Sequence, residues 1–177
     1  LVVNINMNIN NKEIKFDKKI FIIADEIKDN HPEFKGKKWI CDLLKEEFKT
    51  FFPNNYVENP YNADIIWYLA SWNIRFVSKK CKNVKEWYNL LSSKKIIATF
   101  HHIDMEKYIE GQHDKILNFF KKYDTTYHSI CNKTTKSLNQ ININNVKTLK
   151  LWSNNKNFFP IENKDYIRGK YNIPTNC

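Results

Sequence analysis

The sequence predicts an α/β fold, with a Rossmann-like and mostly parallel sheet flanked by helices. Two observations predict it: short apolar runs of strand length recur along the chain, and segments with helical periodicity separate them. Unalternated apolar runs are typical of strands buried on both faces of a parallel sheet. Strands that alternate with helices indicate βαβ units. The expected strands are 18–24, 63–70, 95–100, 125–130 and 146–152.

The segments between these runs carry apolar residues at helical spacing. The clearest one covers 39–52, where apolar side chains recur at i, i+3 and i+4 until Pro53 ends the pattern. A short helix is expected over 84–91 and a long one over 105–123. After the fourth strand, the side-chain oxygen of Asn132 is expected to cap another short helix.

Length and composition are typical of one domain. The chain has 177 residues, 42% of them hydrophobic, which is enough for a sizeable core. We expect residues 18–177 to form the domain, and residues 1–17, where apolar residues alternate with asparagine, to form an N-terminal arm or an edge strand. No run approaches the roughly 20 apolar residues of a membrane span, and the N-terminus does not resemble a signal peptide. The sequence therefore predicts a cytoplasmic protein and leaves peripheral membrane contact open.

Charge and cysteine content weigh against several classes of partner. The net charge is +10, yet only Arg75 and Arg168 of the 29 basic residues are arginine. A nucleic-acid reader favours arginine, whose planar fork matches phosphate and guanine, so no nucleic-acid partner is predicted. The four cysteines are scattered without a close pair, which favours free thiols over a zinc site or a disulfide framework.

Ligands of open parallel sheets bind outside the carboxyl ends of the strands. The first residues after each strand are therefore the informative ones, and these are 25–26, 71–72, 101–102, 131–132 and 153–154.

Two adjacent histidines, His101 and His102, follow the third strand, with Asp104 close behind. Neighbouring side chains at a strand end point to opposite sides, and no HxH or HExxH spacing is present, so a metal site is not predicted. One histidine facing a ligand, His101, is the preferred interpretation. A histidine that hydrogen-bonds a neighbouring loop is the alternative.

Gly36 lies just before the first predicted helix, whose N-terminal backbone N–H groups could hold a phosphate with Lys37 adding charge. A simple turn glycine is the alternative. The basic run at 78–85 is compatible with a contact to anionic lipid, or with a solvated loop.

Several aromatic residues surround the second strand. Trp67 and Tyr68 lie within it and are expected in the core. Trp72 lies beyond the strand, where its ring could stack on a sugar.

The order of four segments, KKIIATFHHID, YDTTYHSICNKTTKSL, VKTLKLWSNNKNFFP and RGKYNIP, resembles the N-terminal domain of group 1 glycosyltransferases of the GT-B fold. The resemblance covers residues 18–177. The family's glycine-rich first loop is matched only by Gly36, and its Asn-Gly pair is Ser153-Asn154 here. The positions that match the family are His101, Asp124, Cys131, Leu138, 153–159 and 168–174.

The resemblance implies transfer of a sugar from a nucleotide-sugar donor to an acceptor such as a glycan or lipid-linked glycan, with retention, as in cell-envelope polysaccharide biosynthesis. It implies that this domain binds mainly the acceptor, and that a C-terminal domain outside this chain binds the donor. The chain alone is therefore expected to be inactive. No cofactor or metal is implied.

By the same resemblance His101 is the expected catalytic residue, which positions the donor sugar and stabilises charge as the phosphate leaves. The alternative from another class is a non-catalytic α/β binding module for a glycan or a protein partner. The expected substrate-binding residues are Gly36, Lys37, Trp72, His102, Asn132 and Asn154.

Overall fold

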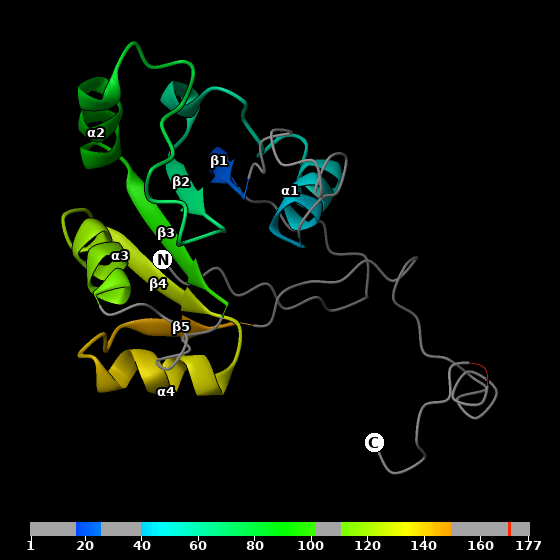
Figure 1. Ribbon diagram of the computed structural model, residues 1–177. Helices are drawn as coiled ribbons and strands as arrows, with labels where there is room; N and C mark the ends of the chain where they lie inside the picture. The colour runs from blue at the N-terminus through cyan, green and yellow to red at the C-terminus, as the bar shows by residue number, and fades with distance from the viewer. Residues whose placement is uncertain (1–16, 26–39, 102–110, 150–169, 171–177) are drawn as a thin grey trace.

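The computed structural model describes residues 17–25, 40–101, 111–149 and 170, without the side chains of residues 112 and 113. Within them the chain forms a five-stranded, all-parallel sheet with helices on both faces (Figure 1). The predicted α/β class is confirmed, and the arrangement is compatible with a Rossmann-like fold. The strands, in their order across the sheet, are β1 (Ile20–Ile23), β2 (Ile65–Tyr68), β3 (Lys95–Phe100), β4 (Thr125–Ser129) and β5 (Val146–Thr148).

The helices between the strands agree with the predicted pattern at three of four places, since the short helix expected after the fourth strand is also present, as α4. Those expected over 39–52 and 84–91 are present as α1 and α2, respectively.

No helix of the described residues is long and apolar enough to cross a membrane. The elements are α1 (Ile40–Phe51), the 3₁₀ turn η2 (Pro60–Asn62), α2 (Val84–Ser92), α3 (Gln112–Phe120) and α4 (Asn132–Gln140).

Two predictions about helix starts are wrong. A continuous helix over 105–123 is not formed, because Gly111 adopts φ 81° in the left-handed region and α3 begins only after it. Asn132 does not cap α4: Cys131 takes the N-cap position with extended backbone, and no side chain of that residue caps the helix. Asn132 is instead the first helical residue. The predicted arm at 1–17, apart from Asp17, lies outside the described residues.

The five strands follow one another across the sheet in chain order, but the segment after α1 first passes to the outer side of β1 before the chain turns back toward β2. The chain therefore reverses its direction across the sheet at β1. After α1 it runs along the outer edge of β1, where Ile20 N–H donates to the Asn55 carbonyl at 2.7 Å and Val57 N–H donates to the Ile20 carbonyl at 3.0 Å. It then passes through η2 to β2, on the other side of β1. From β2 to β5 every step goes the same way.

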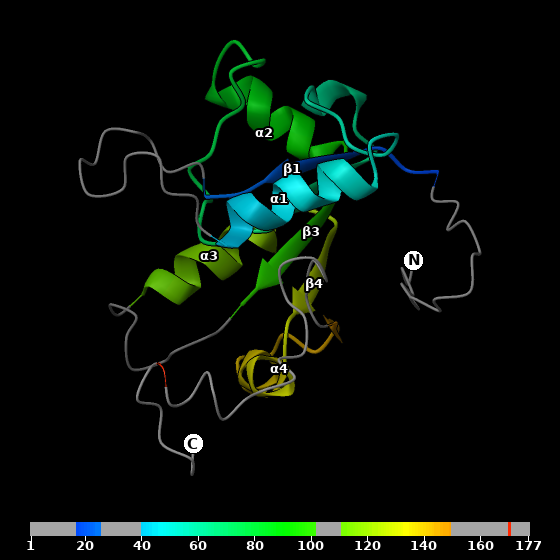
Figure 2. The same cartoon turned by 90° about the vertical axis from the view of Figure 1, so that its right-hand side faces the viewer.

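This reversal explains why the helices lie on both faces. Crossovers between parallel strands are right-handed, so opposite directions of travel place helices on opposite faces. Accordingly, α1 packs on one face through Cys41, Leu44 and Phe48, while α2, α3 and α4 pack on the other. Figure 2 looks onto the first face and shows α1 lying over β1. In such sheets the place where the direction reverses is where ligands bind.

A chain of buried polar side chains crosses the sheet on the α1 face. The His128 Nε2 atom lies 2.9 Å from the Leu149 carbonyl, which can only accept, so this nitrogen carries a proton. In the neutral ring Nδ1 then accepts from the Thr99 hydroxyl at 2.9 Å, and the Thr99 oxygen accepts from Trp67 Nε1–H at 2.8 Å. Every donor therefore has an acceptor, and the network fixes β2, β3 and β4 relative to one another.

The buried position of His128 makes stability depend on pH. Burial lowers the pKa of His128, and the nearby His101 adds to this, while the hydrogen bond to Leu149 opposes it. The unfolded chain therefore binds a proton more readily than the folded one as the pH falls below the ordinary histidine value, and stability decreases with acidity.

We predict that His128→Gln, which cannot titrate, lowers the free energy of unfolding by about 1–3 kcal/mol at pH 7.5, because buried hydrogen bonds are disturbed. The difference in the free energy of unfolding between the variant and the original chain should become smaller toward pH 5.5, because only the original chain loses stability there through protonation of His128. Urea unfolding followed by fluorescence at both pH values measures this. A difference that stays constant with pH would contradict the assignment.

Candidate functional site

The carboxyl ends of β1, β2 and β3 come together because the three strands pair in a common register. Ile23 aligns with Tyr68, and Tyr68 aligns with Ala98. Residues that follow each strand by a few positions therefore meet at one edge of the sheet, beside the start of α1. The side chains gathered there are Asp25, Cys41, Trp72 and His101.

The half-buried His101 is held by a backbone carbonyl of the neighbouring strand end. Its Nε2 atom lies 2.9 Å from the Leu69 carbonyl oxygen and 3.4 Å from the Cys41 sulfur. Because a carbonyl only accepts, Nε2 donates its proton there. Nε2 is therefore the protonated nitrogen of the neutral ring.

Trp72 connects His101 to Asp25. The rings of Trp72 and His101 meet edge-on, with centroids 5.5 Å apart and planes at 62°. Trp72 Nε1–H donates to Asp25 Oδ1 at 2.5 Å. Trp72 nevertheless remains 38% exposed, so its position is fixed while part of its ring stays accessible to a ligand.

Asp25 carries an oxygen atom that its surroundings leave unsatisfied. Its Oδ2 atom is buried and accepts no hydrogen bond of ordinary geometry from the described residues; the nearby Cys41 thiol contributes only a weak interaction. Burial raises the pKa of Asp25, the charge of Asp42 adds to this, and the Trp72 hydrogen bond opposes it. A ligand hydroxyl could satisfy Oδ2 by donating to it.

Cys41 belongs to the site as a packing residue. Burial, with the charges of Asp25 and Asp42, raises the pKa of the Cys41 thiol to about 12. The group is therefore a neutral thiol at physiological pH and not a nucleophile, since the thiolate is the reactive form.

The structure places three of the predicted site residues near one another. His101 and Trp72 are in ring contact. The first turn of α4 is tied to the same place, because Thr134 Oγ1 donates to the His101 carbonyl at 3.2 Å. Asn132 is exposed in that turn. The other predicted residues, Gly36, Lys37, His102 and Asn154, lie outside the described part of the chain.

Sequence reasoning passed over two members of the cluster. Asp25 lies among the strand-end residues 25–26, but the adjacent side chains of Asp25 and Glu26 diverge, so the sequence does not predict that they act as a carboxylate pair. The useful signal was its position at the strand where the chain reverses. Cys41 gave no signal, because it interrupts an ordinary apolar helix pattern.

Among residues 17–25, 40–101 and 111–149, no group of three or more histidine, cysteine, aspartate or glutamate side chains is placed to hold a metal ion. Comparison of the chain with protein-family models, with curated proteins and with solved structures found no match. The family resemblance of the sequence therefore stays a prediction.

Cys131, at the other side of the site, differs from Cys41. It is exposed at the N-cap position of α4, and the hydrogen bond with the Thr134 hydroxyl, at 3.3 Å, is the main cause that lowers the pKa of its thiol. The two thiols therefore have opposite reactivities.

We predict that iodoacetamide at pH 7.5 modifies Cys131 much faster than Cys41, because of these two residues Cys131 is the one that is exposed and has a stabilised thiolate. Peptide mass spectrometry over time measures both rates. Cys131→Ser should remove the fast phase and leave the rate at Cys41 unchanged. Equal rates at the two residues in the folded chain would contradict this difference.

Proposed function

We propose that this domain is the acceptor-side half of a GT-B glycosyltransferase, which takes part in transfer of a sugar from a nucleotide-sugar donor. The observation that supports it best is the cluster at the reversal point of the sheet, where His101, Trp72 and Asp25 meet. The proposal joins this geometry to the sequence resemblance around His101. In the proposed enzyme a second domain closes over this edge and supplies most of the donor contacts.

Each residue of the cluster has a role that fits its surroundings. The exposed part of Trp72 offers an aromatic surface for a sugar ring. Asp25 Oδ2 accepts a sugar hydroxyl. The His101 ring is held by the Leu69 carbonyl beside Trp72, and in its protonated form it stabilises the oxygen on which negative charge develops.

In the proposed reaction the bond between the anomeric carbon and the donor phosphate breaks, a bond to the acceptor oxygen forms, and the acceptor hydroxyl gives its proton to the departing phosphate. His101 stabilises the departing phosphate, so its effect should be stronger in the transition state than in the bound substrate. Removing it should therefore lower turnover more than it weakens substrate binding.

We predict that the product of the complete open reading frame hydrolyses or transfers from a nucleotide sugar, and that His101→Ala lowers kcat by about 10²–10³-fold. Release of nucleoside diphosphate from a panel of uridine, guanosine and adenosine diphosphate sugars measures this. Hydrolysis without an acceptor is included, so that the assay does not depend on the acceptor.

Lys136→Gln, on the exposed surface of α4, is the control and should keep full activity. Circular dichroism and urea unfolding confirm that His101→Ala is folded. Unchanged kcat in that variant would reject the role of His101. A folded protein that binds glycans but turns over no nucleotide sugar would reject the enzyme and favour a binding module.

A further inference from the structure

The densest run of positive charge in the described part of the chain lies between β2 and α2. Residues 79–85, here called the basic segment, contain four lysines in seven positions, and all four are exposed. The proposed function assigns no role to them. The four lysines are Lys79, Lys80, Lys82 and Lys85.

The charge of the basic segment is not neutralised nearby. Residues 70–94 contain six basic residues and a single acid, Glu86. Both oxygens of Glu86 accept hydrogen bonds within the fold, from the Tyr61 hydroxyl at 2.5 Å and from the Lys82 backbone N–H at 2.6 Å. None of the four lysines forms an ion pair within the part of the chain that the structure describes. The segment therefore presents a net positive charge to the solvent.

Exposed apolar side chains lie beside these lysines at the start of α2. Val84 is 49% exposed and Tyr88 is 41% exposed, and they are one helical turn apart, so they share one side of the helix. Tyr88 also contacts Phe119, with ring centroids 6.3 Å apart, which fixes its position. Lysines that flank exposed apolar residues on a short helix are typical of a helix that lies in a membrane interface.

The basic segment is mounted on a folded support. Before it, Phe76 packs against the buried Trp87 at 5.5 Å between ring centroids. The Lys80 backbone N–H donates to the hydroxyl of the buried Ser78 at 3.2 Å. The side chain of Asn83 then caps the first turn of α2. The backbone that carries the lysines therefore does not have to be ordered when a partner binds.

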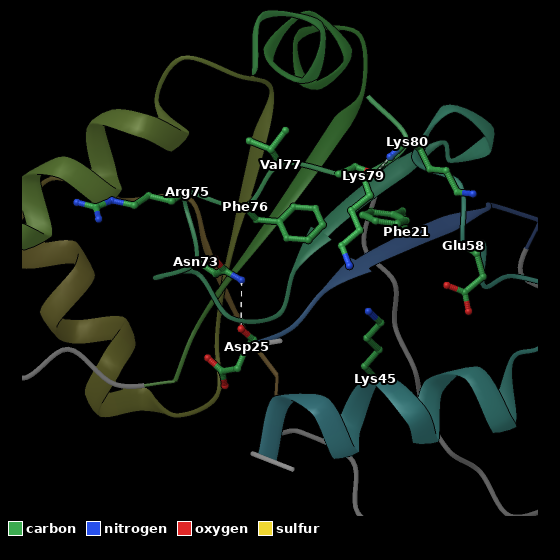
Figure 3. Close-up of a pocket in the computed structure, with 11 residues that line it drawn as sticks. Phe21, Asp25, Lys45, Glu58, Asn73, Arg75, Phe76, Val77, Lys79 and Lys80 are labelled. Atoms are coloured by element: carbon green, nitrogen blue, oxygen red, sulfur yellow. Dashed lines mark hydrogen bonds between the residues drawn. The ribbon is translucent and has the colours of Figure 1, made fainter. Parts of the chain in front are cut away.

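The four lysines do not converge on one point. Lys79 and Lys80 line a hollow of about 650 Å³ beside β1, and Figure 3 shows their side chains extending from the segment in different directions. Lys82 and Lys85 lie on either side of Val84 in the chain. A small anion needs cations that converge on it, whereas the long, flexible stems of diverging lysines can all reach an extended anionic surface. The arrangement therefore favours an extended surface.

The basic segment lies at the opposite edge of the sheet from the candidate site. Tyr61, just before β2, has its hydroxyl 3.5 Å from the Cys81 sulfur, and its carbonyl accepts from Lys94 Nζ at 3.1 Å, just before β3. The segment is therefore at the amino ends of these strands, whereas His101 follows the carboxyl end of β3. In Figure 1, α2 and the loop before it are at the top, and β2 and β3 point away from them. A partner at this edge does not cover the candidate site.

We infer that the basic segment and the first turn of α2 bind the surface of a membrane that contains anionic lipids. The lysine ammonium groups pair with phosphate and carboxylate groups of the lipids, and Val84 and Tyr88 enter the boundary between headgroups and acyl chains. Val84 favours lipid over nucleic acid, because an aliphatic side chain gains stability in the acyl region and none from a phosphate backbone. The inference does not depend on the proposed function.

The binding test uses the 177-residue chain and vesicles of phosphatidylcholine with and without phosphatidylserine, and sedimentation gives the partition coefficient. Phosphatidylcholine alone should bind the chain at least about tenfold more weakly than vesicles with phosphatidylserine. Lys82→Gln/Lys85→Gln should lower the partition coefficient by at least about tenfold, because each lysine at an anionic surface contributes roughly fivefold. Equal binding to both kinds of vesicle, or to neither, would overturn the inference.

The matched control is Lys133→Gln/Lys136→Gln, which makes the same change in net charge at exposed positions of α4. It should keep the partition coefficient within about twofold, because these charges are remote from the bound surface and screened by salt. Equal weakening in both double variants would overturn the inference, since net charge alone would then explain the binding. Circular dichroism and urea unfolding confirm that each variant is folded.

A second comparison tests the apolar contact and the alternative of nucleic acid. Val84→Ser should lower the partition coefficient by about threefold or more, because buried apolar area is lost. Leu43→Ser, at a similarly exposed position on α1, should leave it unchanged. Equal effects of the two substitutions would overturn the assignment of Val84. Binding to polyuridylate that is tighter than binding to phosphatidylserine vesicles, and that Val84→Ser leaves unchanged, would overturn the inference in favour of nucleic acid.

Discussion

The parallel register of β1, β2 and β3 is the constraint on which the rest of the structure depends. It brings three strand ends to one edge, and the reversal at β1 then sends the following segments to opposite sides of that edge. The hydrogen bond from His101 to the Leu69 carbonyl exists only because β3 and β2 are aligned in this way. A one-residue slip would turn each strand's side chains to the other face, and would separate His101 from Trp72.

The two described histidines at the strand ends show how position decides role. His128 is nearly buried, and both of its ring nitrogens are used within the protein. His101 is half-buried, and its Nε2 donates to the Leu69 carbonyl, which can only accept a hydrogen bond. The first arrangement stabilises the sheet. The second holds the ring beside Trp72 at the candidate site.

Asp25 joins the candidate active site to the hollow beside β1, which it lines together with Phe21 and Phe76. Its one carboxyl oxygen accepts from Trp72, and its other lies buried. The basic segment lies at the amino ends of β2 and β3, so the concentrated positive charge and the candidate site are at opposite edges of the sheet.

Much of the fold could be predicted from the sequence because it is encoded by local period and burial. Residues 95–100 form the expected strand, Trp67 and Tyr68 are buried as expected, and Trp72 is exposed beyond its strand. The helix stripe at 39–52 was equally clear, since apolar spacing reports directly which side faces a core. Where the local signal misled, as at Gly111, a single backbone angle decided the outcome.

The candidate site could be predicted only in part. Sequence by itself determined that His101 would follow a buried strand at the carboxyl edge of the sheet, because parallel strands place all their carboxyl ends there. Only the tertiary structure decided its neighbours: Asp25 meets Trp72 across 47 residues, and Cys41 meets His101 across 60. It also decided that the basic segment lies beside Tyr61, at the amino edge of the sheet. Such contacts depend on register and on the direction in which the chain crosses the sheet, and neither leaves a local pattern in the sequence.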